Sequence, residues 1–371
     1  MNNFTLSKNK DLEFFLKSKK FKKIFILCGK KSYASSGGKK MLSKYLKNNI
    51  VKHYFKISPY PELKELKNII SSLRKFEPDL LIAVGGGSVL DYAKIANVVI
   101  NEENLESLII NSNYPFKKKY TELIAIPTTA GSGAEVTVNA VIYIDKKKYS
   151  LENHVIKPDY FFLIPELVIN ASKKIKSSAG FDAIAQATES LISKKSNSES
   201  IKFAKKSLSI SLKYYLDYLQ RPNFENTSAM CVAANLSGKA ISISKTTAPH
   251  AVSYPFTSLY NLSHGHAVSL TLEKFLKFNF INHKKAKCDF DINKRYKTIF
   301  KIFDVQNILE LENAIIEIKK KAKLESNFVK LKINLKNNID KLLSGINLQR
   351  LKNNPVDLNN KDVKTILLKS N

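Results

Sequence analysis

The first half of the chain alternates short apolar runs with amphipathic helical patterns. The apolar runs are KIFILCG, HYFKI, DLLIAVGGG and ELIAIPTT, and segments such as PELKELKNIISSLRKF lie between them. Strand and helix in alternation are typical of βαβ units, whose parallel strands form a sheet covered by helices on both faces. The sequence therefore predicts an α/β domain over residues 1–178, with a polar hairpin near VIYIDKKKYS.

The pattern changes beyond residue 178. SIKFAKKSLSISLKYYLDYL, SAMCVAANLSGKAISIS and DVQNILELENAIIEIKKKAK carry the apolar spacing of amphipathic helices, and strand signals are few. A chain of 371 residues is also longer than one hydrophobic core usually serves. We therefore expect a second, all-helical domain over residues 179–371.

The formal net charge of +29 raises the question of nucleic-acid binding. Of the 61 basic residues, 61 minus 4, or 57, are lysines, and they are scattered along the whole chain. Base recognition relies on the rigid fork of arginine, so this composition argues against a nucleic-acid partner. We expect a solvated basic surface that weakly attracts anionic ligands. The four arginines are Arg74, Arg221, Arg295 and Arg350.

The sequence shows no clear signal for membrane insertion, secretion or cysteine-based chemistry. No apolar run reaches the ~18 residues that a membrane span needs, and MNNFTLSKNKDLEFF lacks a hydrophobic signal core. Cys28, Cys231 and Cys288 show no CxxC spacing, so neither a disulfide framework nor a thiolate zinc site is indicated. We expect a cytoplasmic enzyme without a membrane partner.

LLIAVGGGSVLDYAK places a glycine turn between a buried strand and a helix. Glycines there let the backbone approach a ligand closely, and the free N–H groups of the following helix attract an anion. The turn is a candidate diphosphate site, although a plain tight turn would have the same composition. Asp91, in the helix, could contact a ribose or pair with Lys94. The candidate cofactor residues of this turn are Gly85, Gly86, Gly87 and Ser88.

IAIPTTAGSGAEVT is a second strand followed by a loop of small residues. Thr128, Thr129 and Ser132 offer hydroxyl groups there. Loops at the carboxyl ends of neighbouring parallel strands face one crevice, where open α/β sheets bind ligands. The alternative is a threonine-rich turn that caps its own helix.

Two further motifs offer metal ligands. GFDAIAQATES sets Asp182 and Gln186 four residues apart, on one face of a helix. His250 and His264 are fourteen residues apart across Pro255 and a loop, so they could reach one ion from two helices. Carboxylate and neutral imidazole suit iron or zinc, whereas glutamine is a poor ligand and a lone histidine is more often a core or surface residue.

Taken in order, GGGSVLDYAK, IPTTAGSGAE, GFDAIAQATE and PHAVSYPFTSLYNLSHG resemble the iron-containing (group III, metal-dependent) alcohol dehydrogenase family over roughly residues 12–285. The resemblance implies a dinucleotide-binding α/β domain, an all-helical domain, and a cleft between them that holds NAD(P) and a divalent metal, Fe²⁺ or Zn²⁺. Homodimers are expected by analogy. The family's metal ligands fall on Asp182, Gln186, His250 and His264, and a further family histidine falls on Tyr254.

DAIAQATES, SKTTAPHAVSYP and HGHAVSL resemble the branch of this family that reduces phosphonoacetaldehyde to 2-hydroxyethylphosphonate. A lysine with neighbouring hydroxyl groups suits a phosphonate dianion. Lys245, Thr246 and Thr247 precede His250 and are the candidate substrate residues. The alternative is a lysine at a helix end, with the threonines in a turn.

The resemblance implies hydride transfer from C4 of the reduced nicotinamide to the aldehyde carbon, with the metal polarising the carbonyl oxygen. Tyr254 or His266 could pass the proton that the alkoxide needs, or could serve packing alone. Gly29 stands where NAD-selective relatives carry an aspartate, so NADPH is permitted. Lys148 resembles the family lysine that contacts the cofactor.

Other functions remain open at this point. The same fold could serve a generic dehydrogenase for a small alcohol, lactaldehyde or a polyol, although the missing histidines at 186 and 254 count against it. A non-catalytic cofactor-binding homologue and a lyase of the dehydroquinate synthase kind are weaker alternatives.

Overall fold

The computed structural model describes residues 9–112 and 114–368. Contacts divide the chain into two compact units. Unit 1 comprises Met1–Ser172 and Asn223–Asn235, and unit 2 comprises Lys173–Pro222 and Leu236–Asn371. Helix α9 (Phe224–Ser244) contributes residues to both.

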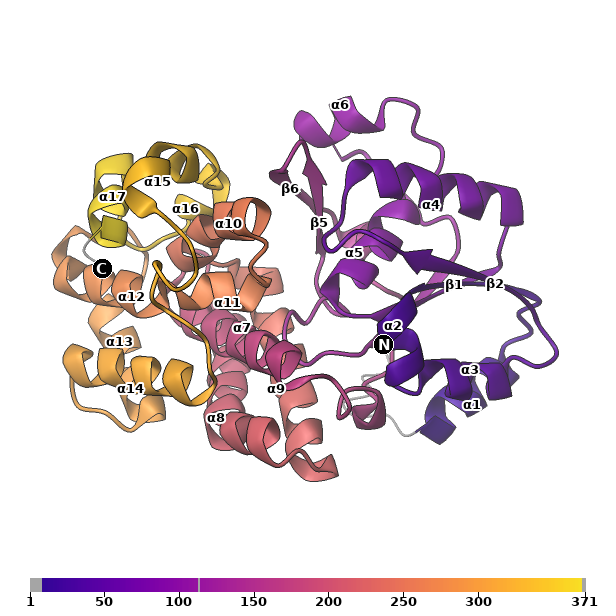
Figure 1. Ribbon diagram of the computed structural model, residues 1–371, viewed down its shortest axis with the longest axis horizontal. Coiled ribbons are helices and arrows are strands. Elements are labelled where there is room, and N and C mark those ends of the chain that lie inside the picture. The colour runs from indigo at the N-terminus through magenta and orange to yellow at the C-terminus, as the bar shows by residue number, and fades with distance from the viewer. Residues whose placement is uncertain (1–8, 113, 369–371) are drawn as a thin grey trace. The chain divides into compact units, whose positions relative to one another are not determined.

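Unit 1 contains a parallel sheet, in which the described residues form five strands in the order β2-β1-β3-β4-β7. Figure 1 labels β1 and β2, which lie side by side in this sheet. This order puts β3 in the middle, between β1 and β4, and leaves β2 and β7 at the edges. The predicted runs become β1 (Lys23–Gly29), β2 (Ile50–Lys56), β3 (Leu80–Gly85) and β4 (Glu122–Pro127), and β7 is Tyr160–Phe161.

Both faces of this sheet are buried, because successive strand residues point to opposite sides. Ile24 and Ile26 pack in one core, whereas Phe25 and Leu27 pack in the other. This explains why the central strands are continuously apolar, and it confirms the predicted α/β class. The first core includes residues of α1 (Asn9–Ser18), α2 (Lys30–Ser35) and α3 (Gly38–Tyr45), and the second includes residues of α4 (Leu63–Phe76), α5 (Gly87–Ala96) and α6 (Leu105–Ile110).

The predicted hairpin is also present. Strands β5 (Asn139–Ile144) and β6 (Lys147–Glu152) pair antiparallel. Asp145 and Lys146 connect them with φ angles of 48° and 64°, the left-handed conformation that a tight two-residue hairpin requires. The hairpin packs on α5, so it lies beside the glycine turn that starts this helix.

Unit 2 is helical, as predicted. Its central helix is α7 (Lys173–Ile192), which is buried along most of its length and contacts α8, α11 and α13. A helix buried on all sides has no polar face to give to water, so its polar side chains require partners within the protein. The other α-helices are α8 (Ser198–Gln220), α10 (Ala248–Tyr260), α11 (His264–Ser269), α12 (Leu272–Ile281), α13 (Ile292–Phe303), α14 (Ile308–Lys321), α15 (Leu335–Ser344), α16 (Leu348–Leu351) and α17 (Asn360–Leu368).

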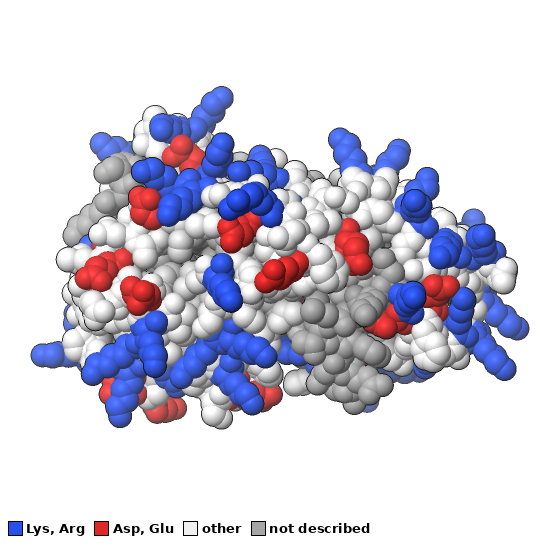
Figure 2. Space-filling model, turned by 90° about the horizontal axis from the view of Figure 1, so that it is seen from below, with Lys and Arg blue, Asp and Glu red and all other residues white. Residues whose placement is uncertain are grey.

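The charged residues are dispersed. Figure 2 shows lysine and arginine side chains spread over the visible face, with acidic side chains among them. This distribution matches the scattering of lysines along the sequence. The described helices include none with both the length and the apolarity of a bilayer span.

Candidate metal centre and cofactor loops

Helix α7 carries three polar side chains on one buried face. Asp182, Gln186 and Glu189 follow one another at four and three residues, so they lie in a row along the helix. All three are buried. Burying two carboxylates on one helix is costly unless positive or hydrogen-bonding groups face them.

Two histidines from other helices face this row. His250 lies in the first turn of α10, and His264 is the first residue of α11, after Asn261 ends α10 in a left-handed conformation. The Nε2 atom of His250 lies 3.3 Å from Oδ1 of Asp182, and Nε2 of His264 lies 3.9 Å from the same oxygen. One ligand atom from each of the three residues can be chosen so that all lie within 4.8 Å of one another. The structure therefore brings together three of the four predicted metal ligands.

Gly265 permits this approach of α11 to α7. A Cβ atom at this position would lie 1.9 Å from the carbonyl oxygen of Ser178 and 2.9 Å from Cβ of Asp182. The backbones of the two helices are thus in direct contact beside a candidate ligand. Only glycine fits there without moving α11.

Gly265→Ala is expected to destabilise the protein by about 1–3 kcal/mol, the usual cost of overpacking, and to weaken metal binding. Thermal unfolding with and without Zn²⁺, together with a metal titration, would measure both effects. Gly38→Ala is the matched control, because its Cβ would lie 3.2 Å from a Tyr33 ring carbon in unit 1. Equal metal affinity in the wild type and Gly265→Ala would contradict this account of the helix contact.

Glu189 orients His250. One carboxylate oxygen hydrogen bonds Nδ1 of His250, and the other accepts the Thr247 N–H at 2.7 Å and the Thr247 hydroxyl at 2.8 Å. With Nδ1–H donating to Glu189, the Nε2 atom of His250 points toward Asp182 and His264, and it offers a lone pair there once the imidazole is neutral. A carboxylate behind a ligating histidine is a recurrent feature of metal sites.

The three residues fit a divalent ion. Nε2 of His250 is buried and makes no hydrogen bond with the described residues. Two ligands at ~2.0–2.1 Å from a tetrahedral ion lie about 3.3 Å apart, which matches the separation of His250 and Asp182. A carboxylate and two imidazoles are a donor set suited to zinc or iron.

Metal binding at this site has to displace a proton. Burial lowers the pKa of His250, but Glu189 and Asp182 together outweigh burial and raise it to about 9. The imidazole of the metal-free protein is therefore charged at neutral pH. Because a ligating imidazole is neutral, binding of an ion releases this proton.

Gln186 supports Asp182. Its Nε2 donates to Oδ2 of Asp182 at 3.1 Å, and its Oε1 accepts the hydroxyl of Ser237 at 2.9 Å. If the Gln186 amide were rotated by half a turn, its oxygen would face the Asp182 carboxylate, and the two acceptors would repel each other. Gln186 thus lies where the sequence predicts a fourth ligand, but its amide oxygen is engaged by Ser237.

The two predicted proton donors differ in their surroundings. The Tyr254 ring lies 6.2 Å from the His264 ring. Burial raises the pKa of Tyr254, although a hydrogen bond from Arg350 acts in the opposite direction. Nε2 of His266 donates to the carbonyl of Glu325 at 2.7 Å, and burial lowers the pKa of this histidine. Since His264 and His266 are two residues apart on α11, their side chains point to different sides of the helix.

The predicted substrate residues form the connection between α9 and α10. Lys245 has a left-handed backbone with φ of 60°, and its ammonium donates to the carbonyl of Ser242 at 2.8 Å. The carbonyl of Thr246 accepts from Nδ2 of Asn353 at 2.9 Å. Thr247 donates to Glu189, so this segment is tied to the metal cluster through one carboxylate.

In unit 1, the two predicted cofactor loops touch. A Cβ on Gly87 would lie 2.8 Å from the Ser132 hydroxyl, and a Cβ on Gly86 would lie 3.4 Å from the Thr129 hydroxyl. The N–H of Thr128 donates to the carbonyl of Gly85 at 3.0 Å. The carboxyl ends of β3 and β4 thus present glycines, hydroxyl groups and the amino end of α5, which together suit an anionic ligand.

Behind these loops, Asp91 and Lys94 bind backbone groups. Asp91 accepts the N–H of Val141 at 3.2 Å. Burial raises its pKa to about 6, although Lys94, the Val141 N–H and Lys148 act in the opposite direction. The ammonium of Lys94 donates to the Thr137 hydroxyl at 2.8 Å and to the carbonyl of Ala134 at 3.1 Å. Lys94 thereby holds the segment that follows Ser132. Ser88, in the first turn of α5, is half-buried.

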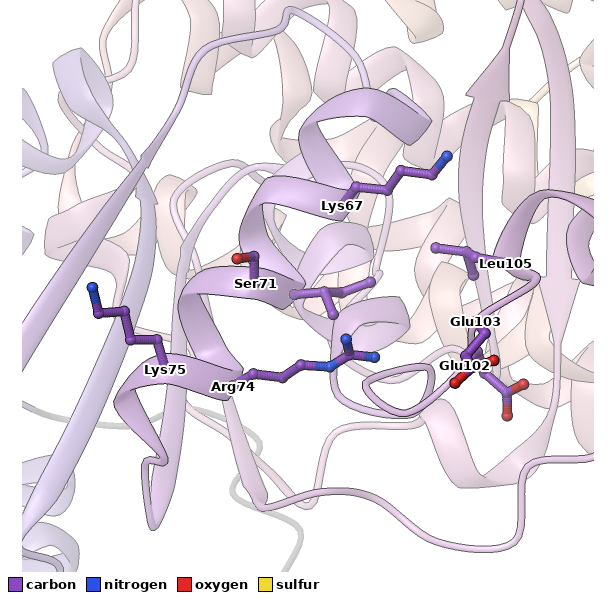
Figure 3. Close-up of a pocket in the computed structure, with 8 residues that line it drawn as sticks. Lys67, Ser71, Arg74, Lys75, Glu102, Glu103 and Leu105 are labelled. Carbon is purple, nitrogen blue, oxygen red and sulfur yellow. The ribbon is translucent and has the colours of Figure 1, made fainter.

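A separate depression of about 490 Å³ lies on unit 1 (Figure 3). Lys67, Ser71, Arg74 and Lys75 come from α4, and Glu102 and Glu103 come from the turn before α6. Its charges are mixed, and no predicted site residue lines it.

Comparisons with known proteins agree with this fold and cluster. Residues 5–165 match the family described as iron-containing alcohol dehydrogenase, and residues 176–371 match the C-terminal domain of the Fe-containing alcohol dehydrogenase family. The chain belongs to the iron-containing alcohol dehydrogenase family. This confirms the predicted family and the enzyme class that it defines.

The individual relatives share only about a third of their residues with this chain over the matched segments. The chain is 31% identical over 217 residues to phosphonoacetaldehyde reductase of Streptomyces viridochromogenes, covering 56% of this chain and 55% of that protein. It is 29% identical over 246 residues to 4-hydroxybutyrate dehydrogenase of Clostridium kluyveri, covering 65% of each. The matches thus span less than two thirds of these relatives. In fold, the chain resembles sulfoacetaldehyde reductase from Bifidobacterium kashiwanohense in complex with NAD⁺, with a TM-score of 0.86, 24% identity, and coverage of 98% of this chain and 96% of that one.

Sequence reasoning missed several residues around the metal cluster. Glu189 had a usable signal, because it lies seven residues after Asp182 and hence on the same helix face. Ser237 and Arg350 carry no such sequence signal, because each lies on a helix distant from Asp182 in the sequence and belongs to none of the motifs.

Proposed function

We propose that this protein is a metal-dependent NAD(P)H oxidoreductase that reduces phosphonoacetaldehyde to 2-hydroxyethylphosphonate. The observation that carries the proposal is the cluster of Asp182, His250 and His264, with His250 oriented by Glu189, in a chain of this family. The similarity to phosphonoacetaldehyde reductase supports the choice of substrate. The similarity to 4-hydroxybutyrate dehydrogenase makes a carboxylate-bearing substrate the second candidate.

Asp182, His250 and His264 would hold the divalent metal, and Gln186 would orient Asp182 rather than coordinate. The bound metal supplies Lewis-acid polarisation of the aldehyde, and NAD(P)H supplies the hydride. The phenol of Tyr254 carries its proton at neutral pH, and burial raises its pKa further. Tyr254 is therefore our preferred donor of the final proton, because the Nε2 proton of His266 is engaged by Glu325.

The glycine and threonine loops of unit 1 would bind the cofactor diphosphate. The backbone N–H groups at the start of α5 and the hydroxyls of Thr129 and Ser132 are the donors that this role requires. Asp91 and Lys148, on the neighbouring helix and hairpin, are the further candidates for the nucleotide.

The test follows the absorbance of NADH and NADPH with phosphonoacetaldehyde, succinic semialdehyde, propionaldehyde or no substrate. With glycerol, which can only be oxidised, it follows the formation of NADH or NADPH from the oxidised cofactor. Protein stripped of metal is compared with protein reloaded with Fe²⁺ or Zn²⁺. We expect metal-dependent turnover, highest with phosphonoacetaldehyde. Higher kcat/KM for an uncharged substrate would favour the generic alcohol dehydrogenase, and cofactor binding without turnover would favour a non-catalytic homologue.

Gly29 allows a test of cofactor choice. It ends β1 and precedes α2, and a Cβ there would meet only the flexible hydroxyl of Ser32, at 2.7 Å. Gly29→Asp is expected to lower kcat/KM for NADPH by about tenfold or more relative to NADH, because its carboxylate would repel the 2'-phosphate. Gly29→Asn is the uncharged control. Wild-type kcat/KM far higher with NADH, or identical effects of the two variants, would show that Gly29 does not face the 2'-phosphate.

A further inference from the structure

Arg350 is a buried arginine on the short helix α16. Its residue is 9% exposed, although most basic side chains of this protein lie at the surface. Its backbone N–H donates at 2.8 Å to the side chain of Asn347, which caps the helix. A guanidinium stays charged when it is buried, so this position places a permanent positive charge inside unit 2.

Hydrogen bonds on both sides of Arg350 fix α16 against the start of α10. The N–H of Asn347 donates to the carbonyl of Ala251 at 3.3 Å. On the other side, Nδ2 of Asn353 donates to the carbonyls of Ser244 and Thr246, both at 2.9 Å. These acceptors lie on either side of His250 in the sequence, so α16 lies against the segment that carries this ligand.

The guanidinium of Arg350 reaches toward the metal cluster through Tyr254. The guanidinium acts on the Tyr254 phenol and lowers its pKa, so the two side chains are close, and Tyr254 is also within electrostatic range of Asp182 and Glu189. The Tyr254 ring lies 6.2 Å from the ring of His264. Of the three clustered residues, His264 has the most exposed side chain, at 34%, so it marks the side from which a substrate can approach.

The charges at this site favour an anion. The carboxylates of Asp182 and Glu189 have a combined formal charge of −2, which a divalent ion of charge +2 would cancel. The guanidinium of Arg350 then leaves the site with a net charge of +1. A neutral aldehyde gains nothing from this excess charge, whereas an anionic aldehyde does. The planar fork of arginine also matches the oxygens of a phosphonate in a bidentate contact.

We propose that Arg350 binds the phosphonate group of the substrate and selects anionic aldehydes, with Tyr254 holding the guanidinium on the His264 side of the metal cluster. This inference rests on the proposed function, because it names the residue that recognises the substrate's acid group. The sequence prediction assigns that role to Lys245, whose ammonium instead donates to the carbonyl of Ser242. The two assignments predict different mutant phenotypes.

The experiment compares kcat/KM for phosphonoacetaldehyde and for propionaldehyde in the metal-loaded full chain. The variants are Arg350→Ala, Arg350→Lys and Lys245→Ala, and Arg221→Ala is the control at an exposed arginine of the same unit. We expect Arg350→Ala to lose roughly 10- to 100-fold with phosphonoacetaldehyde, as removal of a hydrogen bond to a charged group predicts. Propionaldehyde should lose clearly less, because it has no anionic group for Arg350 to bind, and Arg350→Lys should recover part of the loss with phosphonoacetaldehyde.

Equal losses with both aldehydes, or a selective loss in Lys245→Ala but not in Arg350→Ala, would overturn the inference. If the wild type prefers succinic semialdehyde, the proposed substrate fails, and the same comparison with that carboxylate decides whether Arg350 selects anions. If the wild type reduces no aldehyde, calorimetric binding of 2-hydroxyethylphosphonate to the zinc-loaded protein decides. Binding weakened in Arg350→Ala supports the role of Arg350, and equal or absent binding refutes it.

Discussion

Asp182→Asn is expected to lower kcat/KM on the order of 10³-fold, the largest effect of any single substitution considered for this protein. The amide keeps the volume of the carboxylate but removes the only negative charge that directly faces both His250 and His264 among the residues of the cluster. Loss of a metal that polarises the carbonyl removes several kcal/mol of transition-state stabilisation. Elemental analysis after reloading with Zn²⁺ should show metal well below one equivalent.

Asp304→Asn is the matched control for this substitution. Asp304 is exposed and ends α13 with φ of 56°, a conformation that asparagine tolerates. Its metal content and kcat/KM should equal those of the wild type. Full metal occupancy and activity in Asp182→Asn would mean that the ion binds elsewhere.

Glu189→Ala should have the second largest effect, and it should act on stability as well as on metal binding. Breaking a buried charged pair costs about 3–5 kcal/mol, because His250 would lose its Nδ1 acceptor and Thr247 would lose the acceptor of its N–H. Loss of a carboxylate behind a ligating histidine typically weakens metal affinity about 10- to 100-fold. Denaturant unfolding and a Zn²⁺ titration would measure the two effects separately.

Glu189→Gln separates orientation from charge. Its amide oxygen can still accept the His250 Nδ1–H, but its NH₂ group cannot accept from Thr247. We therefore expect affinity between those of the wild type and Glu189→Ala, with a Co²⁺ absorption spectrum close to that of the wild type. Identical Zn²⁺ affinity in all three proteins would show that Glu189 does not position His250.

The sequence predicted the parts of this structure that depend on local pattern. The strand and helix alternation of unit 1 was readable because apolar spacing is a property of short segments, and the glycine and threonine loops were placed by following the strands before them. The sequence also singles out Asp182, His250 and His264, because each belongs to a motif, and the structure brings the three together. The hydrogen bond between Gln186 and Ser237 depends on how two helices pack, and the spacing of residues within one segment does not predict it.

The same limit applies to Arg350. Its placement depends on hydrogen bonds from the Asn347 backbone N–H and the Asn353 side-chain amide to carbonyl groups about a hundred residues earlier in the chain. The sequence alone does not predict this placement, because Arg350 belongs to none of the motifs. Lys245 is the sequence candidate for anion binding because it lies five residues before His250, yet its ammonium donates to the carbonyl of Ser242.

The uneven burial of the three clustered residues has a kinetic consequence. The side chains of His250 and Asp182 are 4% and 5% exposed, whereas that of His264 is 34% exposed. A chelator would therefore reach a bound ion most easily on the side of the His264 imidazole. We therefore expect the rate of metal dissociation to depend on how often the His264 side chain changes rotamer, because the side chains of His250 and Asp182 are buried.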